Sequence, residues 1–307
     1  MNKVAEELLK AISDWQGGEL TGAYNIREDG GCGGRQSTEN IKIESKKDKD
    51  GIDIFIAPGT KDESVFIPAC VTKSNVNDLV YNDFHVGEGA DVRIIAGCGV
   101  HADGEGEAAH NGIHRFFVGK GAKVVYEEKH IGTGEGKGEK KIDPVTYVEL
   151  EEDAVLEMET VQIGGVDHSV RTTSGKLADR ARLVVHESIM TEGVEYAKTD
   201  FDVEMDGEDS AVDIISRSVA KDESYQEYHS KINGNNRCTG HSECDAILVG
   251  KGRVNAAPEL YAGHLDASLI HEAAIGKVAG EQILKLRTLG LTEEEAEQKI
   301  IDGFLRG

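Results

Sequence analysis

A short segment near the C-terminal end of the sequence gathers residue types that bind metals. The run NNRCTGHSECDAILVG places Cys238 and Cys244 on either side of His241 and Glu243, directly before an apolar stretch. Thiolate, imidazole and carboxylate groups together suit zinc or iron. The alternative is that Cys244 packs in the core while His241 decorates a turn. Spacing alone leaves both interpretations open.

A second segment, SLIHEAAIGKV, places His271 beside Glu272 among small and apolar residues. Burying an ionisable group is costly unless the group is paired or bound to a metal. The two residues are therefore a capped or solvated helix start, an acid/base pair, or two metal ligands. Taken alone, the segment favours the helix start.

A third candidate group lies in HADGEGEAAHNGIH, which contains His101, Asp103, His110 and His114. His110 and His114 are four positions apart, a spacing that puts two ligands on one face of a helix. The adjacent Asn111–Gly112 pair disfavours a helix, however. The composition favours a solvated loop over a metal site.

The other cysteines stand in different contexts. Cys70 and Cys98 lie in apolar, strand-like segments, where a free cysteine is commonly a small core residue. We expect both in the core, with relay of sulfur by an internal thiol as the open alternative. Cys32 lies in a glycine-rich stretch, and the neighbouring residues do not indicate a function for it.

Several common catalytic motifs do not occur in the sequence. GTGEGKGEKK, which begins at Gly132, is glycine-rich and basic but lacks the spacing of a phosphate-binding loop. There is no G-x-S-x-G nucleophile elbow and no C-x-x-C pair. Any nucleotide chemistry must therefore come from another chain.

Composition excludes several classes of function. The 307 residues carry a formal charge of −23, which disfavours binding to nucleic acid or to an anionic membrane surface. The N-terminal run MNKVAEELLKAISDW lacks the apolar core of a signal peptide, and no segment approaches a membrane span. Five scattered cysteines do not form a disulfide framework. We expect a reduced, cytoplasmic protein.

Period-two alternation of apolar residues predicts strands through the middle of the chain, for example in DVRIIAGCGV and RLVVHESIM. A unit of turn, small residue and strand recurs. The small residues are at 90, 122, 154, 181 and 210, at intervals of 32, 32, 27 and 29. A period of this length built from strands indicates a β-helix. A β-sandwich would not explain the recurring unit.

Helices are predicted at both ends. Val4, Leu8, Leu9, Ile12 and Trp15 form one apolar stripe, which Gly17–Gly18 should end. At the other end, one helix is predicted from the spacing of Ile283, Leu284, Leu286 and Leu289. A second helix should begin at a capping box formed by Thr292 and Glu295. Its apolar stripe consists of Ala296, Ile300, Phe304 and Leu305. The predicted organisation is an N-terminal helical or extended segment (1–34), a β-helix core (35–256) and a C-terminal helical domain (257–307).

The stretch from Glu243 to Leu305 resembles the C-terminal signature of the SufB/SufD family, the scaffold components of the SUF iron–sulfur cluster assembly system. The matching features are Cys244–Asp245 before an apolar strand, Pro258–Leu260, His271–Ala273, and the RTLGLTEEEAEQKII hairpin. GAYNIREDG and RQSTENI near the N-terminus resemble compact members of the family. The likeness is fainter over the β-rich middle.

The resemblance implies a mainly β fold with a right-handed parallel β-helix core, an N-terminal helix and a C-terminal helical domain. It implies a non-enzymatic scaffold that builds and transfers a transient iron–sulfur cluster, either [4Fe–4S] or [2Fe–2S]. It also implies a partner, the ABC-type ATPase SufC, docked on the C-terminal helices. A chain shorter than typical SufB, as this one is, suggests a homodimer formed through the β-helix.

Residue by residue, the resemblance implies that Cys244, His271 and Glu272 bind the nascent cluster, because they match the cluster-linked cysteine, the HEA-motif histidine and the adjacent SufB-type acid. Cys238, His241 and Glu243 are additional candidates. A mixed ligand set is weaker than four thiolates, which suits a scaffold that must release its product. The alternatives are a SufD-like structural partner of SufC that holds no cluster, and a carbohydrate-active enzyme on a β-helix, which the missing signal peptide and single tryptophan disfavour.

Overall fold

The computed structural model describes residues 3–13, 15 and 20–306. A short helix, α1 (Lys3–Ile12), precedes a long run of strands, and two helices, α2 (Gly280–Thr288) and α3 (Glu293–Arg306), follow it. The predicted stop of the first helix at Gly17–Gly18 lies outside the described residues. Among the described helices, none is long and apolar enough to cross a membrane.

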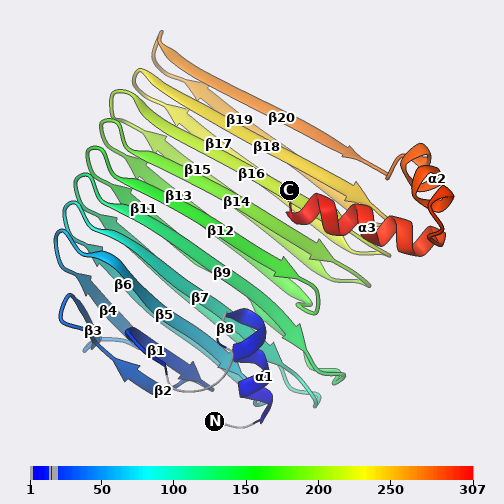
Figure 1. The fold of residues 1–307 in the computed structure, drawn as a ribbon, viewed down its shortest axis with the longest axis horizontal. Coiled ribbons are helices and arrows are strands. Elements are labelled where there is room, and N and C mark those ends of the chain that lie inside the picture. Colours follow the sequence, from blue (N-terminus) through cyan, green and yellow to red (C-terminus); the bar gives the residue numbers. More distant parts are fainter. Residues whose placement is uncertain (1–2, 14, 16–19, 307) are drawn as a thin grey trace.

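The strands form a two-sheet solenoid (Figure 1). Antiparallel hairpins stand at its N-terminal end: β1 (Ala23–Glu28) with β2 (Gly31–Gln36), and β3 (Ile41–Ser45) with β4 (Gly51–Ile56). Beyond them, every pairing between strands is parallel in the part of the chain that the structure describes. The prediction of a mainly β solenoid with terminal helices is confirmed.

Each coil gives one strand to each sheet. Sheet A continues from β1 through β5 (Lys61–Val71), β7 (Asp91–His101), β9 (Lys123–Thr133), β12 (Val155–Ile163), β14 (Arg182–Thr191), β16 (Ser210–Ala220), β18 (Cys238–Leu248) and β20 (Ala267–Gly276). Sheet B continues from β4 through β6 (Val76–Val86), β8 (Ala108–Val118), β10 (Lys140–Ile142) and β11 (Val145–Leu150), β13 (His168–Leu177), β15 (Tyr196–Met205), β17 (Tyr225–Gly234) and β19 (Arg253–Ala262).

The repeated small residue explains how the coils stack. Ala90, Ala122, Ala154, Ala181 and Ser210 are all buried at the turn before a sheet A strand. The residue before each one has a positive φ between 56° and 65°, and is glycine, aspartate or arginine. Bonds such as Lys123 N–H to Ala90 O, at 2.7 Å, tie one coil to the next. A larger side chain in this column would have to displace the neighbouring coil.

The interior is mostly aliphatic, but it contains a buried charged cluster centred on Arg171. Arg171 donates to Glu128 Oε2 at 2.6 Å and to His130 Nδ1 at 3.1 Å, and its Nε lies 3.4 Å from Glu187 Oε1. Burial raises the pKa of Glu187, and Arg171 opposes that effect. Burial alone would also raise the pKa of Glu128, but His130 and Arg171 hold it well below its usual range.

The terminal helices cover parts of sheet A. Helix α1 packs on β5, β7 and β9 so closely that a Cβ atom at Gly97 would lie 2.7 Å from Ile12 O. Helix α3 lies over β14 and β16 (Figure 1), and Ser188 Oγ donates to Leu305 O at 2.9 Å. The predicted capping box forms, because Thr292 and Glu295 each accept the other's backbone N–H. The buried residues of α3 are Ala296 and Ile301, whereas Ile300 is half-buried.

The helical part begins later than predicted. The sequence placed its start at residue 257, but β19 and β20 extend the solenoid to Gly276, and α2 starts at Gly280. The pattern of apolar residues changes near Pro258, and this change was interpreted as the end of the strands. Pro258 lies inside β19, which is an edge strand of sheet B, and edge strands are where sheets tolerate proline.

Candidate functional site

The candidate residues near the C-terminal end lie on two paired strands, β18 and β20. The parallel register places Ser242 opposite His271, Glu243 opposite Glu272, and Cys244 opposite Ala273. Successive side chains of a strand point to opposite faces of its sheet. The six candidates therefore divide into an interior set, Cys238, Cys244 and His271, and an exterior set, His241, Glu243 and Glu272.

This division separates His271 from Glu272. The sequence favoured a helix start for the pair, but the two residues are neighbours on a strand and face opposite sides of sheet A. They cannot act on one ion together within a single chain in this arrangement. We treat the two faces as two subsites.

The interior subsite lies at the open end of the solenoid. The Ser242 hydroxyl lies 2.9 Å from Tyr228 Oη, 3.1 Å from Ser230 Oγ and 3.2 Å from His271 Nδ1. His271 Nε2 is buried and has no hydrogen-bond partner among the described residues. Burial lowers the pKa of this imidazole, and nearby His241 lowers it further. A neutral imidazole with an unused ring nitrogen is the form that ligates metal.

Cys244 lies two residues along β18 from Ser242, on the same interior face. Its side chain is buried, and burial, together with the nearby acids Glu187 and Asp245, raises the pKa of the thiol to about 12. The thiolate, not the thiol, is the metal ligand. In the isolated chain, Cys244 is therefore a neutral thiol that must lose its proton before it can ligate metal. Cys238 is also buried, but it is six residues away, about 20 Å along the strand, so the two thiols do not meet within one chain.

The exterior subsite brings together His241, Glu243 and Glu272, whose ligand atoms all lie within 4.8 Å of one another. His241 Nε2 is 3.8 Å from Glu272 Oε2, and His241 Nδ1 is 2.8 Å from Asp213 Oδ1 on β16. A histidine that ligates metal commonly gives its other ring N–H to a carboxylate, which fixes the ring and its tautomer. Asp213 was not among the residues predicted from the sequence, although the coil interval of 28 residues between positions 213 and 241 could have revealed it.

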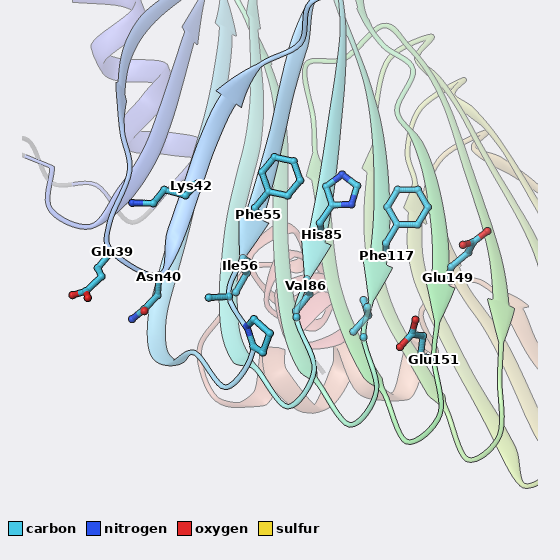
Figure 2. Close-up of a pocket in the computed structure, with 15 residues that line it drawn as sticks. Glu39, Asn40, Lys42, Phe55, Ile56, His85, Val86, Phe117, Glu149 and Glu151 are labelled. Atoms are coloured by element: carbon cyan, nitrogen blue, oxygen red, sulfur yellow. The ribbon is translucent and has the colours of Figure 1, made fainter.

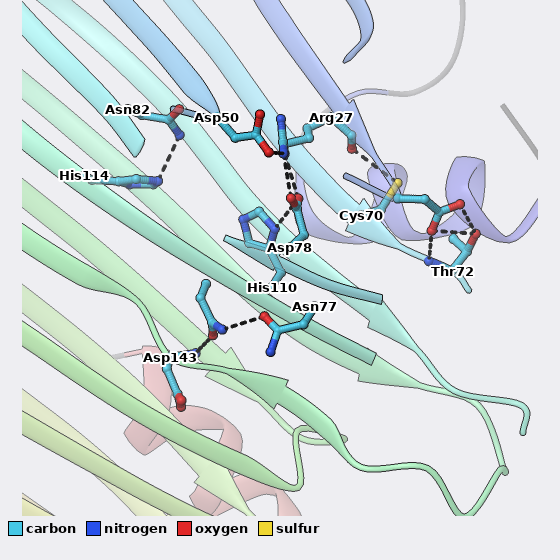
Figure 3. Close-up of polar contacts among 12 residues, drawn as sticks. Arg27, Asp50, Cys70, Thr72, Asn77, Asp78, Asn82, His110, His114 and Asp143 are labelled. Atoms are coloured by element: carbon cyan, nitrogen blue, oxygen red, sulfur yellow. Dashed lines mark hydrogen bonds and ion pairs between the residues drawn. The ribbon is translucent and has the colours of Figure 1, made fainter. Parts of the chain in front are cut away.

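The third candidate group does not form a site. His101 lies 2.8 Å from Asp103 and 2.9 Å from Thr133 Oγ1. His110 and His114 belong to strand β8, not to a loop, and both are buried. Figure 3 shows them using different partners, because His110 Nδ1 is 3.1 Å from Asp78 and His114 Nε2 is 3.3 Å from Asn82. Within the described residues, none of the four candidates belongs to a cluster able to hold an ion.

The remaining cysteines lie far from β18. Cys70 and Cys98 are buried, as expected, and Cys32 is exposed on β2. The Cys98 thiol lies close to Glu128 and His130. An arginine can only donate, so the bond from Arg171 makes His130 Nδ1 an acceptor and places the ring proton on Nε2, which lies 3.3 Å from Glu128 Oε1. Glu128 and His130 therefore both belong to the buried charged cluster around Arg171, which was not predicted from the sequence.

Comparison with known proteins identifies the chain's relatives. Residues 72–304 match the family model for the SUF system FeS cluster assembly SufBD core domain. An iron–sulfur cluster assembly SufBD family protein of Archaeoglobus fulgidus is 30% identical over 275 residues, covering 88% of this chain and 72% of the relative. A protein of the same description from Methanothermobacter thermautotrophicus is 28% identical, covering 85% of this chain and 64% of the relative. A third, from Methanocaldococcus jannaschii, is 26% identical and covers 88% and 86%.

Proposed function

The chain belongs to the SUF-system SufBD family of iron–sulfur cluster assembly proteins, and from that premise we propose that it is a scaffold on which a nascent cluster is built. The site is the C-terminal end of the solenoid, where β18 and β20 carry both subsites. The observation that carries the proposal is His271, whose buried and unpartnered Nε2 lies on the same interior face as the Cys244 thiol.

The open end of the solenoid supports self-association. Strands β19 and β20 are the last strands of their sheets, and no other strand of the described chain pairs with their outer edges. Inward residues of the last coil, such as Ala256 and Leu269, are only half-buried, and Ile270 is 53% exposed on the outer face. Free edges of this length are templates for pairing with another chain. We propose a homodimer across this end, which would bring two copies of Cys244 and His271 together.

The exterior subsite has the chemistry of a place to hold iron before it enters a cluster. One imidazole and two carboxylates, with Asp213 orienting the ring, suit a divalent first-row metal such as ferrous iron. Iron is here the substrate of assembly. We propose that His241, Glu243 and Glu272 bind it, and that Cys244 and His271 ligate the cluster as it forms.

The C-terminal helices have the character of a docking unit. Helix α2 contains no buried residue within its described length, and Leu284 and Leu289 are 62% and 74% exposed. Large apolar side chains that are this exposed are consistent with an interaction surface. We propose that a SufC-type ABC ATPase covers them and supplies the energy that opens the interior subsite. The five cysteines are all free thiols, which is consistent with work in the reducing cytoplasm.

The experiment that tests the function is anaerobic reconstitution of the purified chain with ferrous iron and sulfide, with and without the cognate ATPase. We expect iron, acid-labile sulfide and cluster absorption to remain with the chain after desalting. A chain that binds the ATPase but retains neither iron nor sulfide would instead be a SufD-like structural partner. Subsite variants separate the roles: H271A should weaken cluster retention, whereas H241A should weaken ferrous binding measured before sulfide is added.

A further inference from the structure

A second surface feature lies on the other sheet and near the other end of the solenoid. It is a groove of about 560 Å³ on the outer face of sheet B. Its floor is formed by Phe55 on β4, His85 on β6 and Phe117 on β8. Figure 2 shows the three rings standing in a row across these strands, with Glu149 and Glu151 beyond Phe117. We call Phe55, His85 and Phe117 the aromatic strip.

The strip is a direct result of the strand register. Phe55 pairs with His85, His85 with Phe117, and Phe117 with Glu149, so the four side chains form one ladder across four coils. The Phe55 and His85 rings are 4.8 Å apart and inclined by 12°, and the His85 and Phe117 rings are 5.3 Å apart and inclined by 11°. Phe55 is 42% exposed at the end of the row. The result is a flat aromatic surface bordered by a carboxylate.

The charges around the strip define what it can accept. Glu149 and Glu151 lie at one end of the groove, and Glu39 lies at the other. Among the described residues that line the groove, the one lysine is Lys42, and its ammonium donates to Thr38 O at 2.7 Å. An anionic ligand would meet three carboxylates here. A planar cation matches both features, because its face stacks on the rings and its charge is balanced at the edge.

The molecule already uses this mode of contact with its own arginines. The Arg115 guanidinium carbon lies 5.9 Å from the centre of the Phe117 ring while the same group pairs with Asp83. On the same sheet, Arg253 lies 5.1 Å from the Tyr225 ring. Guanidinium groups are the planar cations that proteins carry, and a chain with a formal charge of −23 attracts basic partners.

We propose that the aromatic strip binds an arginine-bearing basic segment of a partner protein. The inference goes beyond cluster assembly, since the strip shares no residue with the subsites on β18 and β20. Phe55, Glu39 and Lys42 also precede residue 72, where the match to the family domain begins. The surface therefore combines that domain with the segment before it.

The test compares two fluorescein-labelled peptides of equal charge, octa-arginine and octa-lysine, by fluorescence anisotropy at physiological salt with the full chain. We expect octa-arginine to bind more tightly. The double variant F55A/F117A leaves the net charge unchanged and should reduce octa-arginine affinity by about two- to fivefold for each ring removed, with little effect on octa-lysine. Y225A, which removes another aromatic ring of sheet B, is the matched control and should change neither.

Three results would overturn the proposal. The first is equal affinity of the wild-type chain for the two peptides, which would indicate attraction by net charge alone. The second is an unchanged arginine preference in F55A/F117A, or in F55A alone if the double variant loses its circular dichroism spectrum. The third is displacement of octa-arginine by a neutral maltooligosaccharide, which would identify a sugar site. Cluster reconstitution is measured on the same variants, so failure of this proposal is distinguishable from failure of the scaffold role.

Discussion

Replacing Arg171 by methionine is the sharpest test of how the solenoid interior is held together. The guanidinium is buried between Glu128 and Glu187 and also donates to His130. Methionine keeps most of the volume and removes the charge. Glu128 would retain Tyr126 Oη at 2.8 Å, and Glu187 would retain the Ser216 hydroxyl at 2.8 Å, but neither carboxylate would keep its arginine.

Removing one partner of a buried ion pair costs about 3–5 kcal/mol, because the remaining charge is left uncompensated. We expect R171M to lose that much free energy of unfolding at pH 8. Without Arg171, the folded-state pKa of Glu187, which burial already raises, increases further, and the folded-state pKa of Glu128 also rises. An acid with a raised folded-state pKa favours the folded state at low pH and loses that contribution as pH rises. The loss in R171M should therefore shrink as pH falls from 8 towards 5.

The assay is urea denaturation followed by circular dichroism at several pH values, with R182M as the matched control. Arg182 is exposed at the start of β14, so the same substitution there should change stability by less than about 0.5 kcal/mol. Adding E128Q to R171M removes one stranded charge and should recover part of the loss. A loss in R171M below about 1 kcal/mol, or one independent of pH, would refute the buried-pair account.

Further predictions concern packing, capping and loop contacts. A122V places a branched side chain in the column of small residues at the turns and should cost about 1–3 kcal/mol in urea unfolding, while A267V at the open end should cost much less because Ala267 is only partly buried. T292A removes half of the capping box and should destabilise α3 by about 1 kcal/mol, seen as faster amide hydrogen exchange confined to that helix; unchanged exchange would contradict it. G138A should destabilise the contact between the loop that contains Gly138 and the loop that contains Gly106, since its Cβ would lie 2.0 Å from Gly106 O. A thermal midpoint of unfolding equal to that of the wild-type chain would argue against this contact.

The fold was predictable where the sequence repeats. Ala90, Ala122 and Ala154 recur because each coil needs a small residue at the same turn. Their regular spacing therefore predicts a solenoid. The end of the solenoid was not predictable in the same way. The inward positions of the last coil remain apolar, as Val254, Leu260 and Leu269 show, but Pro258, which an edge strand tolerates, interrupts the strand pattern in the sequence.

The candidate site was predictable in its membership but not in its geometry. Residue types and family resemblance selected Cys244, His271 and Glu272. The segment around His271 was not predicted to be a strand, and it is the alternation of strand β20 that places His271 and Glu272 on opposite faces. The buried charged cluster escaped prediction for another reason. Arg171 and Glu128 lie 43 residues apart, and unequal coil lengths hide which positions of different coils meet.

Whether the cluster binds at the C-terminal end of the solenoid is decided by the iron and acid-labile sulfide that C244A retains after anaerobic reconstitution, compared with C70A. Both thiols are buried, and burial raises the pKa of both to about 12, so the variants are matched for the loss of a buried sulfur. We expect that C244A, folded by circular dichroism, loses most of its iron, sulfide and cluster absorption while C70A keeps them. Full retention by C244A would contradict the assignment of the cluster to the C-terminal end of the solenoid.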